Sequence, residues 1–335
     1  MHSAASLVLP DQFLAAPVQQ VHPELAKIVA SDAQFTLLAE GFLWSEGPVA
    51  EPKSNAILFS DVPANKVYRW HPSEGLSVYL SPSGATGLWS DDTRRQGANG
   101  LIFNQQQQLV LAQHGDRRLA ILQKRQAETP VFETLVSHVK NAQTGQQQRF
   151  NSPNDLVQHA DQSYYFTDPP YGLVDGDQST AKELPFNGVW RYAPSGELQL
   201  LVQNLTRPNG LAFSPDQRFL YIANSDSKAA HWWRYEVGSD GLLHSAQLFA
   251  DATEAATSKP GLPDGLKVTP SGHIFATGPG GVWIFHPDGR QLGLLQLPVA
   301  SANLTFSHDF SQLYITASRY LLKFPLQPEF AKQQQ

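Results

Sequence analysis

Cysteine is absent from this sequence of 335 residues. Disulfides, thiolate metal sites and a cysteine nucleophile are therefore excluded, and a metal ion could be bound only by oxygen or imidazole ligands. Basic residues are few and scattered: 24 Lys and Arg stand against 30 Asp and Glu, which gives a net charge of −6. Because a nucleic-acid-binding surface needs a concentrated basic face, we expect no nucleic-acid partner.

Long apolar runs are missing as well. No segment approaches the roughly 18 uninterrupted apolar residues of a membrane-spanning helix, so we expect no membrane partner. Near the N-terminus, Pro10, Asp11 and Gln12 interrupt the apolar stretch, and no charged segment precedes it. Such a segment makes a poor secretory signal. We expect a cytoplasmic protein, with the periplasm as the alternative because a cysteine-free chain suits either compartment.

The sequence does contain an internal repeat. Six segments share a layout of turn residues, an apolar strand, a polar turn, a second strand rich in Tyr, Phe, Ile and Val, and a third aromatic strand. Each begins at a polar residue, and the spacings are 53, 55, 55, 55 and 39 residues between Glu46, Asn99, Asn154, Asn209, Asp264 and Asn303. Short strands at this spacing, separated by turns such as "SPDQ" and "HPDG", predict an all-β fold, a six-bladed β-propeller.

The last repeat is one strand short of a full blade. Residues 33–42, "AQFTLLAEGF", have the composition of a strand and precede the first repeat. We expect them to close the ring as the outer strand of blade six, which removes exposed sheet edges. Residues 24–31 predict a short helix. The expected organisation is an N-terminal extension over 1–32, one propeller domain over 33–326 and a C-terminal tail over 327–335.

The polar residues at the start of the repeats predict a metal site. In a propeller the innermost strand of each blade runs along the central channel, so equivalent residues at the beginning of these strands converge at one rim. Two carboxylates and two amides would meet there, from Glu46, Asn154, Asn209 and Asp264. Such oxygen donors suit Ca²⁺ first and Mg²⁺ or Mn²⁺ next, with Zn²⁺ less favoured in the absence of histidine and cysteine. The alternative is that each is an ordinary turn residue before glycine, but four of them in register favour the metal.

Several motifs resemble a known family. "SEGPV", "NSPNDLV", "YFTDPPYG", "RPNGLAFSPD" and "PDGLKV" occur in the order found in the SMP-30/gluconolactonase/LRE-like family of six-bladed propellers. The resemblance extends from about Gly41 to Phe324, and "FSDVPANKVYRW" and "QHGDRR" are most similar to the bacterial gluconolactonase branch. It implies a divalent metal ion bound by the four residues above, with Asp264 also acting in catalysis.

The chemistry of the residues is consistent with that implication. A bound cation polarises a lactone carbonyl and stabilises the negative charge that develops when water attacks. A carboxylate can accept the proton of that water, whereas an amide cannot. Asp264 would therefore act as the general base or as the nucleophile, and Glu46 would balance the charge of the metal. The sequence alone does not separate these two carboxylates, and the family resemblance favours Asp264.

Other residues are candidates for substrate binding. Asn99 occupies the ligand position in blade two and could contact substrate or complete the metal's hydration shell. His114 could bind a sugar hydroxyl or carry a proton, the alternative being a loop histidine without such a role. Asp168 and Tyr171, in "FTDPPYG", are expected to form a pocket wall. Arg117 or Arg118 could attract a product carboxylate, and Asn303 is interpreted as a structural turn residue.

Together these features predict an enzyme of carbohydrate metabolism. The leading hypothesis is metal-dependent hydrolysis of a sugar 1,5-lactone, glucono-1,5-lactone to gluconate, with a small-molecule lactone as the partner. One alternative is a lactonase for non-sugar lactones or a phosphotriesterase with the same metal centre. Another is a propeller that only binds a ligand. The sequence does not indicate an oligomeric state.

Overall fold

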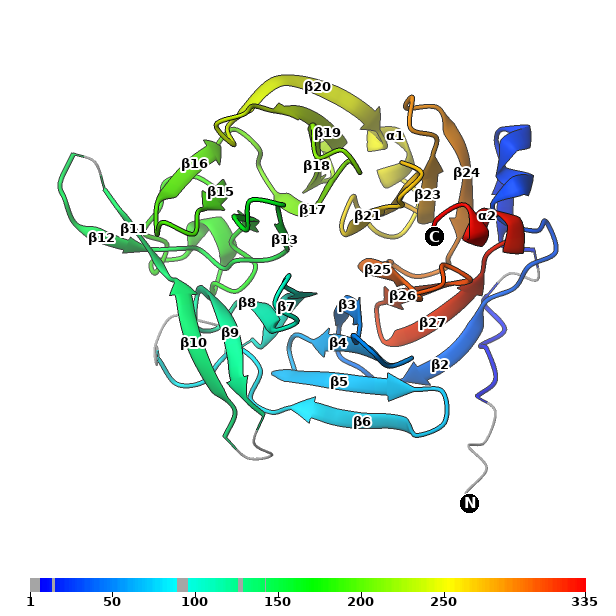
Figure 1. Cartoon of the computed structure of the whole chain (residues 1–335), viewed down its shortest axis with the longest axis horizontal. Coiled ribbons are helices and arrows are strands. Elements are labelled where there is room, and N and C mark those ends of the chain that lie inside the picture. Colours follow the sequence, from blue (N-terminus) through cyan, green and yellow to red (C-terminus); the bar gives the residue numbers. More distant parts are fainter. Residues whose placement is uncertain (1–6, 14–15, 89–95, 126–128, 142) are drawn as a thin grey trace.

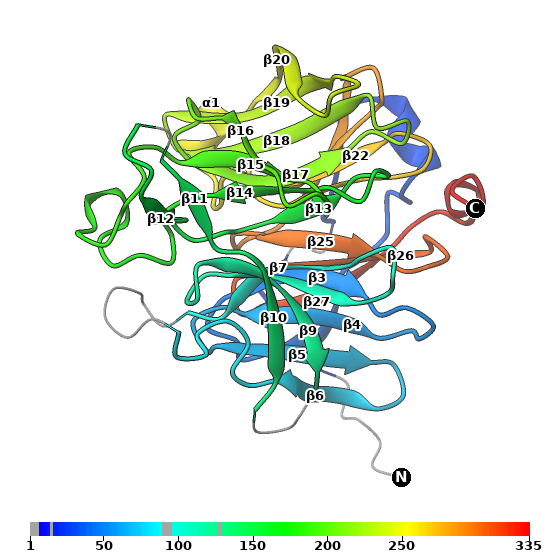
Figure 2. The same ribbon diagram turned by 60° about the vertical axis from the view of Figure 1, so that its left-hand side comes forward.

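The computed structural model describes residues 7–13, 16–88, 96–125, 129–141 and 143–335. Six antiparallel sheets are arranged around a central axis, each with the first strand of its sequence repeat innermost (Figure 1). The predicted all-β, six-bladed propeller is therefore confirmed. Figure 2 shows the sheets from the side, with the blades stacked face against face around the ring.

The strands of the blades follow the order of the repeats. Blade one contains β3 (Ser45–Ala50), β4 (Ile57–Asp61), β5 (Lys66–His71) and β6 (Gly75–Leu80); blade two contains β7 (Ala98–Phe103), β8 (Leu109–Gln113), β9 (Arg118–Lys124) and β10 (Val131–Val136). Blade three contains β13 (Leu156–Gln158), β14 (Tyr164–Asp168), β15 (Gly188–Tyr192) and β16 (Leu198–Val202); blade four contains β17 (Pro208–Phe213), β18 (Phe219–Asp226), β19 (Ala229–Val237) and β20 (Leu243–Asp251).

The last two blades each take one strand from the N-terminal region. Blade five contains β21 (Leu266–Val268), β22 (Ile274–Gly278), β23 (Gly281–Phe285), β24 (Gln291–Gln296) and β1 (Val18–Gln20); blade six contains β25 (Asn303–Phe306), β26 (Gln312–Ala317), β27 (Tyr320–Pro325) and β2 (Thr36–Glu40). A hairpin of β11 (His138–Lys140) and β12 (Gln147–Arg149) projects between blades two and three. The short helices are two 3₁₀ turns (Pro23–Lys27 and Gly176–Gln178), α1 (Thr253–Ala256) and α2 (Pro328–Lys332).

The ring closes as the sequence predicts. β2 pairs antiparallel with β27, with Thr36 opposite Lys323 and Glu40 opposite Tyr320. Ser45 adds a link from blade one, because its hydroxyl donates a hydrogen bond at 2.9 Å to the carbonyl of Tyr320. Blade six is thus built from an N-terminal strand and three C-terminal strands. Because β2 pairs with β27, β27 is not left as an exposed sheet edge.

The N-terminal extension is part of the outer layer of the propeller. β1 adds a fifth strand to blade five, where Val18 lies opposite Leu295. The expected helix over 24–31 is a 3₁₀ helix over Pro23–Lys27, and its buried Leu25 packs into the same apolar cluster as β24 and β27. Burial of apolar surface therefore joins this segment to blades five and six.

The second strand of each blade carries much of the core. β4, β8, β14 and β22 are buried along their whole length, which fits their near-continuous apolar sequences. Outermost strands such as β20 are largely exposed or half-buried. None of the helices in the described ranges is long and apolar enough to cross a membrane.

Candidate active site

A cavity of about 610 Å³ opens at the rim where the inner strands begin. Polar side chains from the start of five inner strands line it: Glu46, Asn99, Asn154, Asn209 and Asp264. Loops that follow the second strands reach the same rim, because neighbouring strands in a blade are antiparallel. His114 and Tyr171 come from such loops, Ser225 comes from the end of β18, and Lys259 comes from the loop after α1. The structure thus brings the four predicted metal ligands into one cavity.

Close contact between inner strands explains the glycine that follows most of these polar residues. A Cβ atom on Gly210 would lie 2.3 Å from the carbonyl oxygen of Asp264, so no side chain fits there. Blade three differs, because Asp155 stands where blades one, two, four and five have glycine. Its carboxylate projects into the channel, and a Cβ on Gly100 would come within 2.7 Å of Asp155 Oδ1. The repeat therefore contains one added carboxylate, which the sequence analysis did not single out although the change from Gly to Asp was visible.

The backbone register corrects the position assigned to blade six. The amide N–H of Asn154 donates to Thr167 O at 2.8 Å, and the N–H of Ala302 donates to Thr316 O at 2.8 Å in the equivalent place. Ala302, and not Asn303, is therefore the counterpart of the ligand residues. Asn303 corresponds to Asp155, and its Nδ2 donates to Asp155 Oδ2 across the channel at 3.3 Å. Asn303 is therefore not a turn residue. Its side chain is buried at the propeller axis, beside Asp155.

Negative charge is concentrated at the floor of the cavity. Burial raises the pKa of Glu46 to about 7, and the nearby charge of Asp155 adds to this effect, although the Gly47 N–H opposes it. Burial also raises the pKa of Asp264 well above its usual value, with further contributions from Glu46 and Asp155. Two mutually repelling carboxylates of this kind favour a bound cation, which would compensate both charges.

The donor atoms fit a divalent cation bound by oxygen. Asp264 Oδ1 and Asn99 Oδ1 are buried and have no hydrogen-bond partner within the described part of the chain. An uncompensated buried carboxylate oxygen is costly, and a cation would satisfy it. Carboxylate and amide oxygens are the ligands that Ca²⁺ prefers. Among the described residues no group of three or more His, Cys, Asp or Glu is arranged to hold a metal, so a cation bound here would also need amide oxygens.

The metal-free protein should lose stability as the pH rises from about 4.5 to about 7. Within that window the folded protein keeps a proton on Glu46 that the unfolded chain has released, so the free energy of unfolding falls as pH rises. The pKa shift of Glu46 alone corresponds to ~3 kcal/mol. Thermal melts of the metal-free protein measure this, and Glu46→Gln should weaken the dependence. Stability that increases with pH across this window would contradict the prediction.

His114 and Tyr171 both lie at the cavity. Burial lowers the pKa of His114 to about 3, so its ring is neutral. His114 Nε2 is 3.4 Å from Asn154 Nδ2, and its Nδ1 is 3.2 Å from Gln96 Oε1. Burial raises the pKa of Tyr171 to about 12, and its hydroxyl interacts with Ser225 and with Asn209. Tyr171 thus belongs to the wall of the cavity, as expected for its loop.

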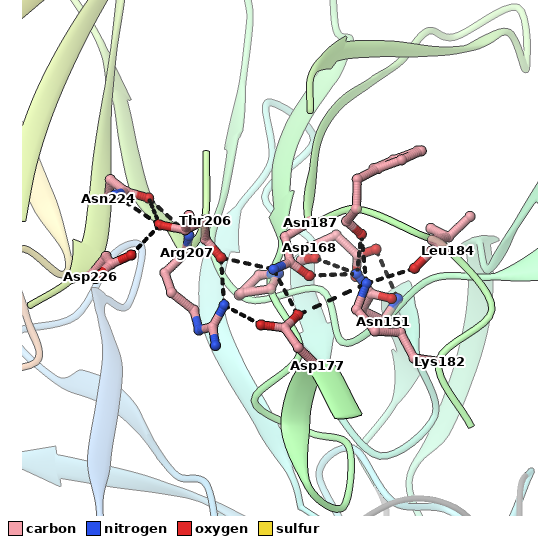
Figure 3. A network of polar contacts seen from close by, with 12 residues as sticks. Asn151, Asp168, Asp177, Lys182, Leu184, Asn187, Thr206, Arg207, Asn224 and Asp226 are labelled. Atoms are coloured by element: carbon pink, nitrogen blue, oxygen red, sulfur yellow. Dashed lines mark hydrogen bonds and ion pairs between the residues drawn. The ribbon is translucent and has the colours of Figure 1, made fainter. Parts of the chain in front are cut away.

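Asp168 lies behind this wall and does not line the cavity, so its expected role in substrate binding is corrected. It is fully buried, and its Oδ2 and Oδ1 accept the backbone N–H groups of Asn151 and Ser152 at 2.8 Å each. Figure 3 shows Asp168 within a polar network that continues through Asn187 to Asp177. Its carboxylate fixes the chain segment that leads into Asn154.

A carboxylate accepts two backbone hydrogen bonds in blade one as well. Asp61 Oδ2 and Oδ1 accept the N–H groups of Leu43 and Trp44 at 3.1 Å each. In blade four, Asn224 Oδ1 accepts the N–H of Arg207 at 2.8 Å (Figure 3). A carboxylate or amide at the end of the second strand therefore holds the entry to the inner strand. These residues act on the site by placing its backbone.

Asp168→Ala should lower the free energy of unfolding by roughly 2–4 kcal/mol, because two buried N–H groups would lose their acceptor. Asp168→Asn, which keeps one acceptor oxygen, should cost less. Chemical denaturation gives the stability. The KM of Asp168→Asn, in which one acceptor still holds the segment before Asn154, should stay close to that of the wild type. A raised KM without loss of stability would instead indicate that Asp168 contacts substrate.

The two arginines also have structural roles. Arg117 is buried, and its Nε donates to the carbonyl of Phe150. Arg118 Nε donates to Gln113 Oε1 at 2.6 Å, and its NH2 forms an ion pair with Asp116 at 3.0 Å. Neither lines the cavity, so the expectation that one of them attracts the product carboxylate is corrected. Lys259, in the loop after α1, lines the cavity instead. It has no counterpart in the repeat, so the sequence carried no signal for it.

Comparisons with known proteins place the chain among lactonases. The model of the SMP-30/gluconolactonase/LRE-like region matches residues 44–319. A gluconolactonase from Zymomonas mobilis is 37% identical over 311 residues, which cover 91% of this chain and 85% of that enzyme. A pentonolactonase from Haloferax volcanii is 22% identical over 277 residues, covering 82% and 81% of the two chains. The solved structure of a gluconolactonase from Xanthomonas campestris superposes with a TM-score of 0.75 at 29% identity, over 93% of this chain and 95% of that one.

Proposed function

The chain belongs to the SMP-30/gluconolactonase/LRE-like family, and we propose that it is a metal-dependent lactonase that hydrolyses a sugar 1,5-lactone to the open-chain aldonic acid. Glucono-1,5-lactone is the proposed substrate. The observation that carries the proposal is the buried Asp264 Oδ1, which has no hydrogen-bond partner in the described part of the chain and belongs to a residue that lines the same cavity as Glu46, Asn154 and Asn209. The Zymomonas mobilis gluconolactonase, at 37% identity, supports the choice of substrate.

In this proposal Glu46, Asn154, Asn209 and Asp264 hold the cation, with Ca²⁺ as the preferred metal. When bound, the cation supplies Lewis-acid polarisation of the lactone carbonyl. Asn99, whose Oδ1 is also buried and unpaired among the described residues, would orient substrate or water beside them. The two carboxylates balance the charge of a divalent ion.

Asp264 takes the proton of the attacking water. The water oxygen bonds to the carbonyl carbon while the proton moves to the Asp264 carboxylate, and the ring C–O bond then breaks. Asp264 passes the proton that it took from water to the ring oxygen, which leaves as a hydroxyl. Asp264 is then a carboxylate again, and lactone plus water has given one aldonic acid. Asp264 can take this proton because it is a carboxylate, whereas the side-chain amides of Asn154 and Asn209 cannot.

The rest of the cavity suits a polyhydroxylated ring. Tyr171, Ser225, Ser227 and Ser301 offer hydroxyl groups along its wall, and Lys259 offers an ammonium group. Apolar surface lies among them, from Trp44, Val62, Pro63 and Leu262. This mixture of hydrogen-bonding groups and apolar walls is typical of a small-molecule site, and it favours a sugar lactone over a purely hydrophobic ester.

A substrate panel tests the proposal. Protein loaded with Ca²⁺ would be assayed with glucono-1,5-lactone, a pentonolactone, an aromatic lactone and a phosphotriester, with acid release followed by a pH indicator. We expect the highest kcat/KM for an aldonolactone. Preference for the aromatic lactone or the phosphotriester would favour the alternative specificities on the same centre. No acceleration over spontaneous hydrolysis for any substrate would reject the enzyme and favour a propeller that only binds a ligand.

A further inference from the structure

Three side chains beside the cavity floor form one hydrogen-bonded chain. Gln96 Oε1 lies 3.2 Å from His114 Nδ1, and His114 Nε2 lies 3.4 Å from Asn154 Nδ2. Gln96 precedes β7, His114 follows β8, and Asn154 precedes β13 in the next blade. These hydrogen bonds therefore link blades two and three beside Asn154, one of the proposed cation ligands.

A neutral imidazole has one donor and one acceptor nitrogen. The hydrogen bonds from Gln96 through His114 to Asn154 can therefore have only two self-consistent directions of donation. In one, His114 Nδ1–H donates to Gln96 Oε1, and Nε2 accepts a hydrogen bond from the Asn154 amide nitrogen. In the other, the Gln96 amide nitrogen donates to Nδ1, and Nε2–H donates to Asn154 Oδ1. The first direction leaves Asn154 Oδ1 as the amide atom that faces the cavity, whereas the second leaves the nitrogen.

The two directions differ in their ability to bind a metal ion. Ca²⁺ and Mg²⁺ take oxygen ligands, and an amide nitrogen that carries two hydrogens is no ligand for them. The direction in which Nε2 is the acceptor is therefore the one that can hold a cation. Groups hydrogen-bonded to metal ligands commonly fix the orientation of those ligands in this way.

We propose that His114, itself held by Gln96, is a positioning residue that keeps Asn154 Oδ1 turned toward the cation site. The inference rests on the proposed metal-dependent function and assigns His114 a role other than contact with substrate. His114 is 1% exposed, and each of its ring nitrogens already faces an amide of the protein. Neither nitrogen remains for a sugar hydroxyl, so the expected substrate-binding role of His114 is replaced by this one.

Calcium affinity is the first test. Isothermal titration of Ca²⁺ into the metal-free wild type gives the reference Kd, and His114→Phe should raise it by ~10–100-fold, as is usual for loss of a group that orients a ligand. In an Asn154→Asp background both ends of the side chain are oxygens, so orientation no longer matters. There His114→Phe should change the Kd much less. An equal change in both backgrounds would overturn the proposal.

Gln96 provides a matched pair that leaves the buried ring in place. Gln96→Glu keeps an acceptor for His114 Nδ1–H and should retain calcium binding, whereas Gln96→Met removes the acceptor and should weaken it. Nitrogen-15 NMR of the His114 ring in the calcium-loaded protein should show Nδ1 protonated and Nε2 unprotonated. This measurement requires no substitution and stays informative if His114→Phe does not fold.

The outcomes separate this inference from the proposed function. A wild-type protein that binds no divalent cation would remove the metal site and the inference with it. If the wild type binds Ca²⁺, two results would overturn the inference but leave the proposed function intact. One is a folded His114→Phe variant with an unchanged Kd, and the other is a His114 ring protonated at Nε2. Weakened binding in both His114→Phe and Gln96→Met, with the Nδ1–H tautomer, would support it.

Discussion

Asp264→Asn is expected to lower kcat for lactone hydrolysis by ~10²–10⁴-fold at saturating Ca²⁺, the usual contribution of a general base. The substitution keeps an oxygen ligand and nearly the same shape but removes the group that accepts the proton of water. Glu46→Gln removes the other carboxylate of the site. If Glu46 mainly balances charge, its loss should raise the Kd for Ca²⁺, and higher Ca²⁺ should restore much of the rate.

A double exchange provides the control for Asp264. Asn209→Asp combined with Asp264→Asn retains two carboxylates and two amides at the floor of the cavity, with the same net charge. We expect this variant to bind Ca²⁺ and to remain nearly inactive, because its carboxylate stands in the wrong blade. Wild-type kcat in the exchange variant would contradict the role of Asp264. A Glu46→Gln variant whose kcat is not restored by higher Ca²⁺, together with an unchanged kcat in Asp264→Asn, would instead assign the proton transfer to Glu46.

Removal of the divalent cation should abolish activity and lower thermal stability together. Without the cation, the carboxylates of Glu46 and Asp264 repel each other in a buried site next to Asp155. A ligand at 100 times its Kd stabilises the folded state by ~2.7 kcal/mol, so the melting temperature of the chelated protein should rise by a few degrees when Ca²⁺ is restored. Differential scanning calorimetry and initial rates on the same samples measure both effects.

The matching control is a protein that has lost both carboxylates. In Glu46→Gln combined with Asp264→Asn, Ca²⁺ and chelator should give the same melting temperature, because neither repulsion nor strong cation binding remains. A wild type whose melting temperature and rate are unaffected by thorough chelation would argue for a reaction that does not depend on a metal ion.

The repeat made much of the architecture predictable from the sequence. Its spacing predicted six blades, and the missing strand of blade six predicted closure by residues 33–42, which contain β2. Glu46, Asn154, Asn209 and Asp264 share one cavity because equivalent positions of a closed ring face the same axis. The attachment of β1 to blade five depends on the packing of a segment outside the repeat, which periodicity does not describe.

The roles of individual polar residues were harder to predict. Asp168 and Asp264 are both aspartates at strand ends, yet Asp168 accepts hydrogen bonds from the backbone of Asn151 and Ser152, whereas Asp264 lines the cavity. Only the direction of the side chain separates them, and composition does not reveal that direction. Asn303 fitted the repeat by residue type, but the strand register places it one position further along. Gln96 matters through a contact with His114 that sequence spacing does not encode.

The most direct measurement is an anomalous difference map from crystals grown with Mn²⁺ or Ca²⁺. We predict a peak on the propeller axis among oxygens of Glu46, Asn154, Asn209 and Asp264, at ~2.3–2.6 Å from them when the metal is Ca²⁺. A map with no peak among these four side chains, recorded from crystals of protein that hydrolyses the lactone, would contradict the assignment of this group as the catalytic centre.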